Sequence, residues 1–137
     1  MKLTDFPFLS WPHTLTLLRV ATALFFMVHA LSRILLGTIG RFGGFMESAG
    51  FPHGVYWVWA ITVSELVAGT LLICNRHVRL AASVLFTVAA GGIVLIHRHF
   101  GWFVGEHGTG GSEYSVALMV LLLVIAAADR EAHRRTG

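Results

Sequence analysis

Apolar residues fill four long stretches of the chain, separated by short polar or glycine-rich segments. An α-helix needs about 20 apolar residues to cross the hydrocarbon of a bilayer, whereas membrane-barrel strands alternate apolar and polar residues. The pattern therefore predicts an all-α, polytopic membrane protein, a four-transmembrane-helix bundle. The apolar stretches are His13 to Leu36, Val55 to Cys74, Val78 to Ile96 and Tyr114 to Ala128. The expected spans lie at about 13–36, 55–74, 78–97 and 112–128.

The composition supports a membrane protein of a single domain covering residues 1–137. The chain is 55% hydrophobic and 12% charged, with a mean hydropathy of +0.73. A soluble domain of this size has too little interior to hide so much apolar surface. The formal net charge is only +3 and no basic stripe with interleaved aromatics is present, so we expect no nucleic acid partner. Cys74 is the only cysteine, which excludes an internal disulfide, and we expect it to be a small buried hydrophobe.

Basic residues at the ends of the apolar stretches predict the orientation. One group lies between the second and third stretches, at Arg76 and Arg79, and Lys2 precedes the first. A third group follows the fourth stretch, in "DREAHRRTG". Four spans put these three segments on one side, which the positive-inside rule makes the cytoplasm. We therefore expect a multi-pass protein of the plasma (bacterial inner) membrane with both termini cytoplasmic.

The two longer connections, residues 37–54 and 97–112, then face outward. Both are rich in glycine and aromatic residues. Gly43–Gly44 and Gly110–Gly111 are typical of turns. The aromatic residues suit a belt at the membrane interface, and they are Phe42, Phe45, Phe51, Trp57, Trp59, Trp102 and Phe103.

Ionisable residues inside the apolar stretches gather, by depth, in the outer half of the expected bundle. They are His29, Arg33, Glu65, His97 and Glu113, with Arg19 lower on the first helix. A lone charge at mid-depth costs at least about 2.5–3.5 kcal/mol, so Glu65 requires a partner. His29 and Arg33 match its depth. Arg19 shares their helix face and can extend toward the cytoplasmic surface.

Three interpretations of this cluster stay open. It is a structural network that fixes helix register, a site for a quinone headgroup, or a metal or haem site. A quinone needs hydrogen-bond donors at its carbonyls, a proton source and an apolar slot, and these residue types supply them. The metal alternative would use His29, His97, His99 or His107, but no two of them share a helix at i,i+4 spacing. We therefore expect no metal or haem.

Four sequence elements, in order, resemble the DoxX family of small four-helix membrane proteins between about Leu15 and Ala128. They are "LLRVATALFFMVHALSRI", "GGFMESAGFP", "SELVAGTLLICNRHVRLAA" and "GSEYSVALMVLLLVIA". Family members often have glycine where this chain has Ala30 and Asn75, and many end in a glycine-rich tail that is missing here. The family is named after a subunit of an archaeal thiosulfate:quinone oxidoreductase. Other members are thought to sit in membrane complexes that respond to oxidative and thiol stress.

Taken together, the residues and the resemblance predict a subunit or partner in quinone-linked sulfur, thiol or oxidative-stress redox chemistry. Glu65 would accept a proton, while His29 and Arg33 would polarise a carbonyl or hold an anion; these three are the expected catalytic residues. Glu113, His97 and Arg19 would bind the cofactor, with His97 as a proton relay. The expected partners are the lipid bilayer and proteins of a membrane redox complex, with a homo-oligomer as a further alternative.

A non-enzymatic role is the competing hypothesis. The chain would then be a membrane anchor or assembly subunit whose polar cluster only locks the helices together. The sequence leaves open whether the chain is catalytic. A transporter has little support, because no apolar stretch carries a mid-depth proline that would break its helix.

Overall fold

A computed structural model describes residues 6–105 and 110–136, and its main elements are all helical. The α-helices are α1 (Trp11–Leu35), α2 (Ile39–Ser48), α3 (Gly54–Ile73), α4 (Val78–Leu95) and α5 (Glu113–Thr136). A short 3-10 helix, η2 (His97–Phe100), follows α4. The all-α prediction is therefore confirmed.

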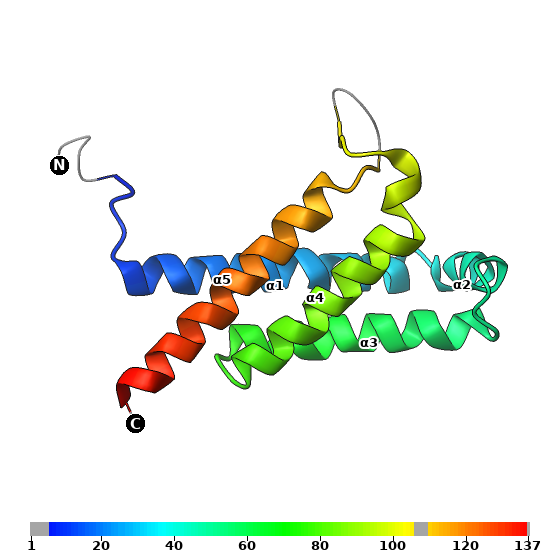
Figure 1. Ribbon diagram of the computed structural model, residues 1–137. Helices are drawn as coiled ribbons and strands as arrows, with labels where there is room; N and C mark the ends of the chain where they lie inside the picture. The colour runs from blue at the N-terminus through cyan, green and yellow to red at the C-terminus, as the bar shows by residue number, and fades with distance from the viewer. Residues whose placement is uncertain (1–5, 106–109, 137) are drawn as a thin grey trace.

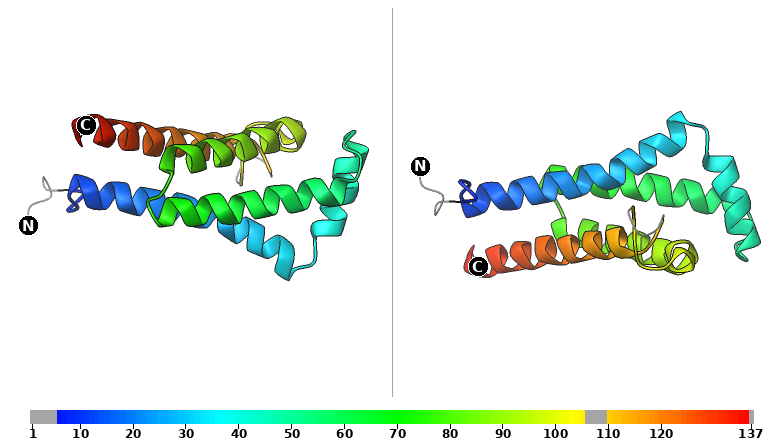
Figure 2. Two further views of the ribbon diagram at one scale, coloured as in Figure 1. Left: turned by 90° about the horizontal axis from the view of Figure 1, so that it is seen from below. Right: turned by 90° about the horizontal axis from the view of Figure 1, so that it is seen from above.

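The helices form two crossed layers. The antiparallel pair α1 and α3 makes one layer, and the pair α4 and α5 lies across it (Figures 1 and 2). The start of α1, the end of α5 and the α3–α4 turn lie toward one end of the molecule, whereas α2 and η2 lie at the other. Small residues such as Ala23, Ala68 and Ala82 are buried between the layers, together with Leu85 and Leu122. Small side chains allow helix backbones to approach closely where no water drives association.

Two helix ends are closed by residues in the left-handed conformation. After α1, Gly37 has φ +63° and the N–H of Thr38 donates to the carbonyl of Arg33. After α3, Asn75 has φ +55° and the N–H of Arg76 donates to the carbonyl of Leu71. Both are Schellman-type ends, for which glycine and asparagine are the suited residues. This explains how asparagine can stand at position 75.

The expected outer loop 37–54 contains a helix that the sequence did not predict. Gly43 and Gly44, which we had assigned to a turn, lie inside α2. Gly43 is buried against Gly54, at the start of α3. Glu47 accepts a hydrogen bond from the N–H of Gly54 at 3.1 Å, which caps α3. Glycine is a poor helix former, so α2 owes its stability to this packing and not to its own propensity.

Other details of the connections also differ from expectation. Cys74 is exposed and not buried, because it directly follows the last residue of α3. Helix α5 continues to Thr136, beyond the span predicted to end near residue 128. The Gly110–Gly111 turn stays a prediction, although both positions favour glycine: Gly110 has φ +76°, and a Cβ on Gly111 would collide with the carbonyl oxygen of Phe103.

Within residues 6–105 and 110–136, three helices are long and apolar enough to cross a membrane: α1 with 25 residues, α3 with 20 and α4 with 18. Large apolar side chains such as Leu24 and Val28 on α1 point away from the bundle. Outward apolar surface on three long helices indicates a multi-pass membrane protein in contact with lipid. The apolar part of α5, Tyr114 to Ala128, is shorter and is bounded by Glu113 and Asp129.

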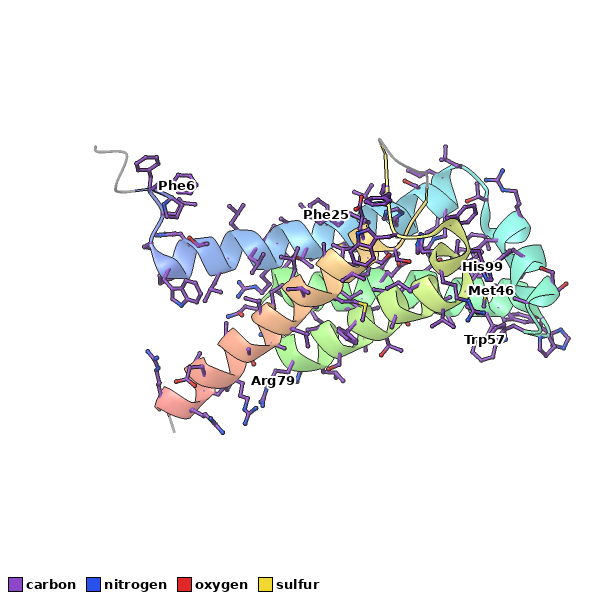
Figure 3. All side chains as sticks on the ribbon, turned by 45° about the horizontal axis from the view of Figure 1, so that its top comes forward. Phe6, Phe25, Met46, Trp57, Arg79 and His99 are labelled. Carbon is purple, nitrogen blue, oxygen red and sulfur yellow. The ribbon has the colours of Figure 1, made fainter. Side chains whose placement is uncertain are left out.

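Aromatic residues gather at the α2 end of the molecule. Figure 3 shows Trp57, Met46 and His99 at this end, while Arg79 lies toward the other end. Trp57 and Trp59 on α3 and Trp102 after η2 are 43–52% exposed. Phe42 differs from the expected belt, because it is half-buried and faces the interior cavity described below. The interfacial belt stays a prediction for the exposed members.

The contact between α2 and α3 yields a stability prediction. A Cβ at Gly54 would lie 1.9 Å from the carbonyl oxygen of Gly43, whereas one at Gly44 would meet nothing within 4 Å. We expect Gly54→Ala to destabilise the protein by about 3 kcal/mol or more, because a backbone atom must move. The matched control Gly44→Ala should be neutral or slightly stabilising, since alanine favours the helix. Thermal melting of both variants in detergent tests this, and equal melting temperatures would contradict the close approach.

Candidate functional site

A buried ion pair joins α1 to α3. Arg33 in the last turn of α1 donates through Nη2 to Oε2 of Glu65, in the middle of α3. Glu65 is only 3% exposed. Arg33 is thus the depth-matched partner that Glu65 was predicted to require. Its charge offsets a carboxylate that would be costly alone in an apolar setting.

Thr62 completes the arrangement on α3. Arg33 Nη1 donates to Thr62 Oγ1 at 2.7 Å, and this hydroxyl donates to the carbonyl of Val58 at 2.8 Å. Thr62 and Glu65 are three residues apart, so they share one helix face and receive the two ends of one guanidinium. This two-point contact fixes the position of the arginine. Among the described residues, Glu65 Oε1 has no hydrogen-bond partner.

The ion pair borders a cavity of about 450 Å³ between the two layers. All five α-helices and η2 contribute to its wall. Its polar lining residues are His29, Arg33, Glu65, Thr87, His97, Tyr114 and Ser115. Its apolar lining residues include Phe26, Phe42, Met46, Ile61, Val88, Leu95 and Leu118. An apolar pocket of this size with a few convergent polar groups is typical of small-molecule sites.

Two histidines border the cavity at different places. His29 lies one turn before Arg33 on α1, so both face the same side. His97 begins η2, and its Nδ1 lies 2.7 Å from the carbonyl oxygen of Gly110. A carbonyl can only accept, so Nδ1 donates this hydrogen bond.

The remaining predicted site residues lie elsewhere. Glu113 accepts a hydrogen bond from the N–H of Val104 at 2.7 Å and is not among the cavity-lining residues. Arg19 donates to Asn75 Oδ1 at 2.7 Å, next to the α3–α4 turn. The structure therefore brings together His29, Arg33, Glu65 and His97, and leaves Glu113 and Arg19 outside.

The structure adds residues that sequence reasoning missed. Thr62 had a usable signal, because it lies three residues before Glu65 on the same helix face. Phe42 and Met46 had none, since they belong to α2, which was expected to be a loop. For the metal alternative, residues 6–105 and 110–136 bring no three His, Cys, Asp or Glu side chains together. His107 lies outside the described residues.

Breaking the ion pair should be costlier than removing it. Glu65→Leu leaves the Arg33 guanidinium uncompensated in an apolar cavity, so we expect a loss of about 3 kcal/mol. The double variant Glu65→Leu/Arg33→Met should recover most of this loss, because neither charge then remains. Unfolding in mixed detergent measures both. Glu131→Leu, which removes an exposed partner of Arg135, is the control with an expected effect below about 1 kcal/mol. Additive effects at 65 and 33 would contradict the pairing.

Comparison with known proteins identifies the family of the chain. A sequence model of the DoxX family matches residues 14–98, a segment that holds Arg33, Glu65 and both cavity histidines and stops before α5. No curated protein and no solved structure matches the chain. The family match covers more than half of the 137 residues, and the chain therefore belongs to the DoxX family.

Proposed function

We propose that this DoxX protein binds a quinone headgroup in the cavity beside Arg33 and Glu65, as a subunit or partner in quinone-linked redox chemistry. The observation that carries the proposal is a buried ion pair at the wall of a cavity that is otherwise largely apolar. Intramembrane ionisable residues are rare and typically mark a site. The family resemblance supplies the redox context, namely sulfur, thiol or oxidative-stress chemistry.

The residues present fit a quinone. The cavity volume of about 450 Å³ is within the range of ligand pockets, and Phe26, Ile61 and Leu118 offer flat or branched apolar walls to a ring. Arg33 and His29 provide donors for carbonyl oxygens. A bound quinone would supply two-electron redox chemistry.

The cavity residues divide the tasks of binding and proton handling. Arg33 holds a carbonyl oxygen or the negative charge of an oxidised sulfur species, and Thr62 and Glu65 keep its guanidinium in place. Glu65 Oε1 accepts a proton or hydrogen bond from the ligand. His97, with Nδ1–H fixed on Gly110, exchanges a proton through Nε2 between the cavity and the loop side.

One observation favours the non-enzymatic alternative. Arg33, Thr62 and Glu65 satisfy one another, so the group is stable without a ligand and fixes the register of α1 against α3. In that role the protein is a membrane anchor or assembly subunit, and its contacts with partner proteins or with a second copy of itself carry the function. The quinone titration described below separates the two functions.

We propose further that the chain is a four-transmembrane-helix bundle of the bacterial inner membrane with cytoplasmic termini. The support is that the start of α1, the end of α5 and the α3–α4 turn share one end of the molecule. Most arginines lie at that end: Arg76, Arg79, Arg130, Arg134 and Arg135. Charge of this sign marks the cytoplasmic side. α5 crosses with its apolar part, Tyr114 to Ala128, by local thinning of the bilayer.

The quinone proposal predicts a loss of affinity in Glu65→Gln. The amide keeps the shape but loses the charge that holds Arg33, so we expect a quinone analogue to bind at least about tenfold more weakly. Quenching of tryptophan fluorescence during titration of the purified protein measures this. Glu131→Gln, at the far end of α5, is the control with unchanged affinity. Unchanged affinity in a folded Glu65→Gln would overturn the quinone site and favour the anchor.

The single native cysteine tests the topology. Cys74 is exposed at the α3–α4 turn, so a membrane-impermeant maleimide should label it in inside-out vesicles and not in intact spheroplasts. In a Cys74→Ser background, Arg134→Cys on α5 should show the same sidedness and Ser48→Cys on α2 the opposite. Opposite labelling of Cys74 and Arg134→Cys would exclude a fourth crossing by α5.

A further inference from the structure

A second recess lies at the end of the molecule opposite α2. It has a volume of about 400 Å³ and is formed where the α3–α4 turn meets the last turns of α5. Its polar lining comes from Asn75, His77 and Arg79 on one side and from Asp129 and His133 on the other. It shares no lining residue with the cavity beside Glu65. Figure 3 shows Arg79 at this end, far from Met46.

A hydrogen bond from Arg19 fixes the orientation of the Asn75 side-chain amide. Arg19 Nη1 donates to Asn75 Oδ1 at 2.7 Å, so the carbonyl side of the amide is engaged. Within the described part of the chain, the amide NH₂ of Asn75 has no hydrogen-bond acceptor. Because an amide in this orientation presents donors on its other side, Asn75 can supply two N–H groups to a ligand.

The carboxylate of Asp129 positions Arg79 and engages only one of the donors of the guanidinium. Asp129 Oδ2 lies 3.3 Å from Arg79 Nε and 3.5 Å from His133 Nδ1. The Asp129 side chain is 15% exposed, whereas that of Arg79 is 58% exposed. In the described residues only Nε of Arg79 is engaged, so the Nη1 and Nη2 fork stays available. A guanidinium fork matches the oxygens of a phosphate.

The surroundings of the recess are also positive. Arg76, Arg130, Arg134 and Arg135 are exposed at the same end. Helix α4 begins at Val78 without a side-chain hydrogen bond at its cap, so its first N–H groups add partial positive charge beside Arg79. Among the described residues that line the recess, Asp129 is the only carboxylate, and it is already paired with Arg79.

We propose that this recess binds a phosphate group through Arg79 and Asn75, with Asp129 as the positioning residue of Arg79. The phosphate belongs either to a phospholipid headgroup at the membrane surface or to a soluble oxyanion. Since the α3–α4 turn connects two apolar helices long enough to cross the membrane, a lipid phosphate lies at the matching depth. The proposal goes beyond the quinone site and does not depend on it.

The experiment compares three probes on the full-length protein in neutral detergent by native mass spectrometry. Phosphatidylglycerol and diacylglycerol of equal chain length differ in the phosphate-containing headgroup, and inorganic phosphate represents the soluble source. We expect phosphatidylglycerol to be retained over diacylglycerol, and Arg79→Gln to weaken its binding about tenfold. Arg134→Gln removes the same charge outside the recess and should change binding less than twofold. Retention of inorganic phosphate without retention of phosphatidylglycerol would assign the site to a soluble oxyanion.

Asn75→Gly is the second variant, and it tests the recess even if Arg79→Gln does not fold. Glycine adopts the left-handed conformation of residue 75 without strain, so the turn stays intact while the amide is lost. We expect it to weaken phosphate binding about threefold. Equal losses in Arg79→Gln and Arg134→Gln, or no binding of either phosphate probe to the wild type, would overturn the proposal. Quinone affinity should be unchanged in both recess variants, so this test fails or succeeds separately from the cavity.

Discussion

An ion pair in apolar surroundings is the constraint on which the arrangement of the bundle depends. Neither Arg33 nor Glu65 can be left alone between helices, because an uncompensated charge there costs several kcal/mol. The last turn of α1 must therefore face the middle of α3, and Thr62 fixes the rotation of α3 as well. Gly69 permits the approach one turn further along, where a Cβ would lie 2.5 Å from Met27 Cγ. The ion pair therefore sets the register of α1 against α3, and small residues allow the two helices to come close enough to form it.

The other helices complete the wall of the cavity beside the Arg33–Glu65 ion pair. α4 contributes small residues, Ala89, Gly91 and Gly92, which leave space where larger side chains would fill the gap. α2 closes the far end with Phe42 and Met46, and it is attached to α3 by the Gly43–Gly54 contact and the Glu47 cap. The cavity therefore exists because the layer of α4 and α5 crosses the layer of α1 and α3 beside the Arg33–Glu65 ion pair, which is fixed between α1 and α3. Its chemistry is polar on the α1–α3 side and largely apolar elsewhere.

The sequence predicted the features that depend on local sequence pattern or on avoiding a large energetic cost. Long apolar stretches dictated the helices α1, α3 and α4, and the cost of a lone carboxylate dictated a partner for Glu65. It did not predict α2, because a glycine-rich helix depends on a neighbour that only the tertiary structure supplies. Glu113 was assigned by depth alone, yet the backbone N–H of Val104 provides a nearer partner. The exposure of Cys74 could not be predicted from its apolar neighbours, because it depends on the residue at which α3 ends, and Cys74 lies just beyond that residue.

The placement of the ion pair also has a consequence for how the protein is made. Arg33 precedes Glu65 by 32 residues, so the arginine is synthesised before its carboxylate partner. α3 and α4 are joined by only four residues, 74–77, which suits their entry into the membrane as one hairpin. When that hairpin arrives, the counter-charge of Glu65 is already present on α1. Order of synthesis thus shortens the time for which a carboxylate is exposed to lipid without a partner.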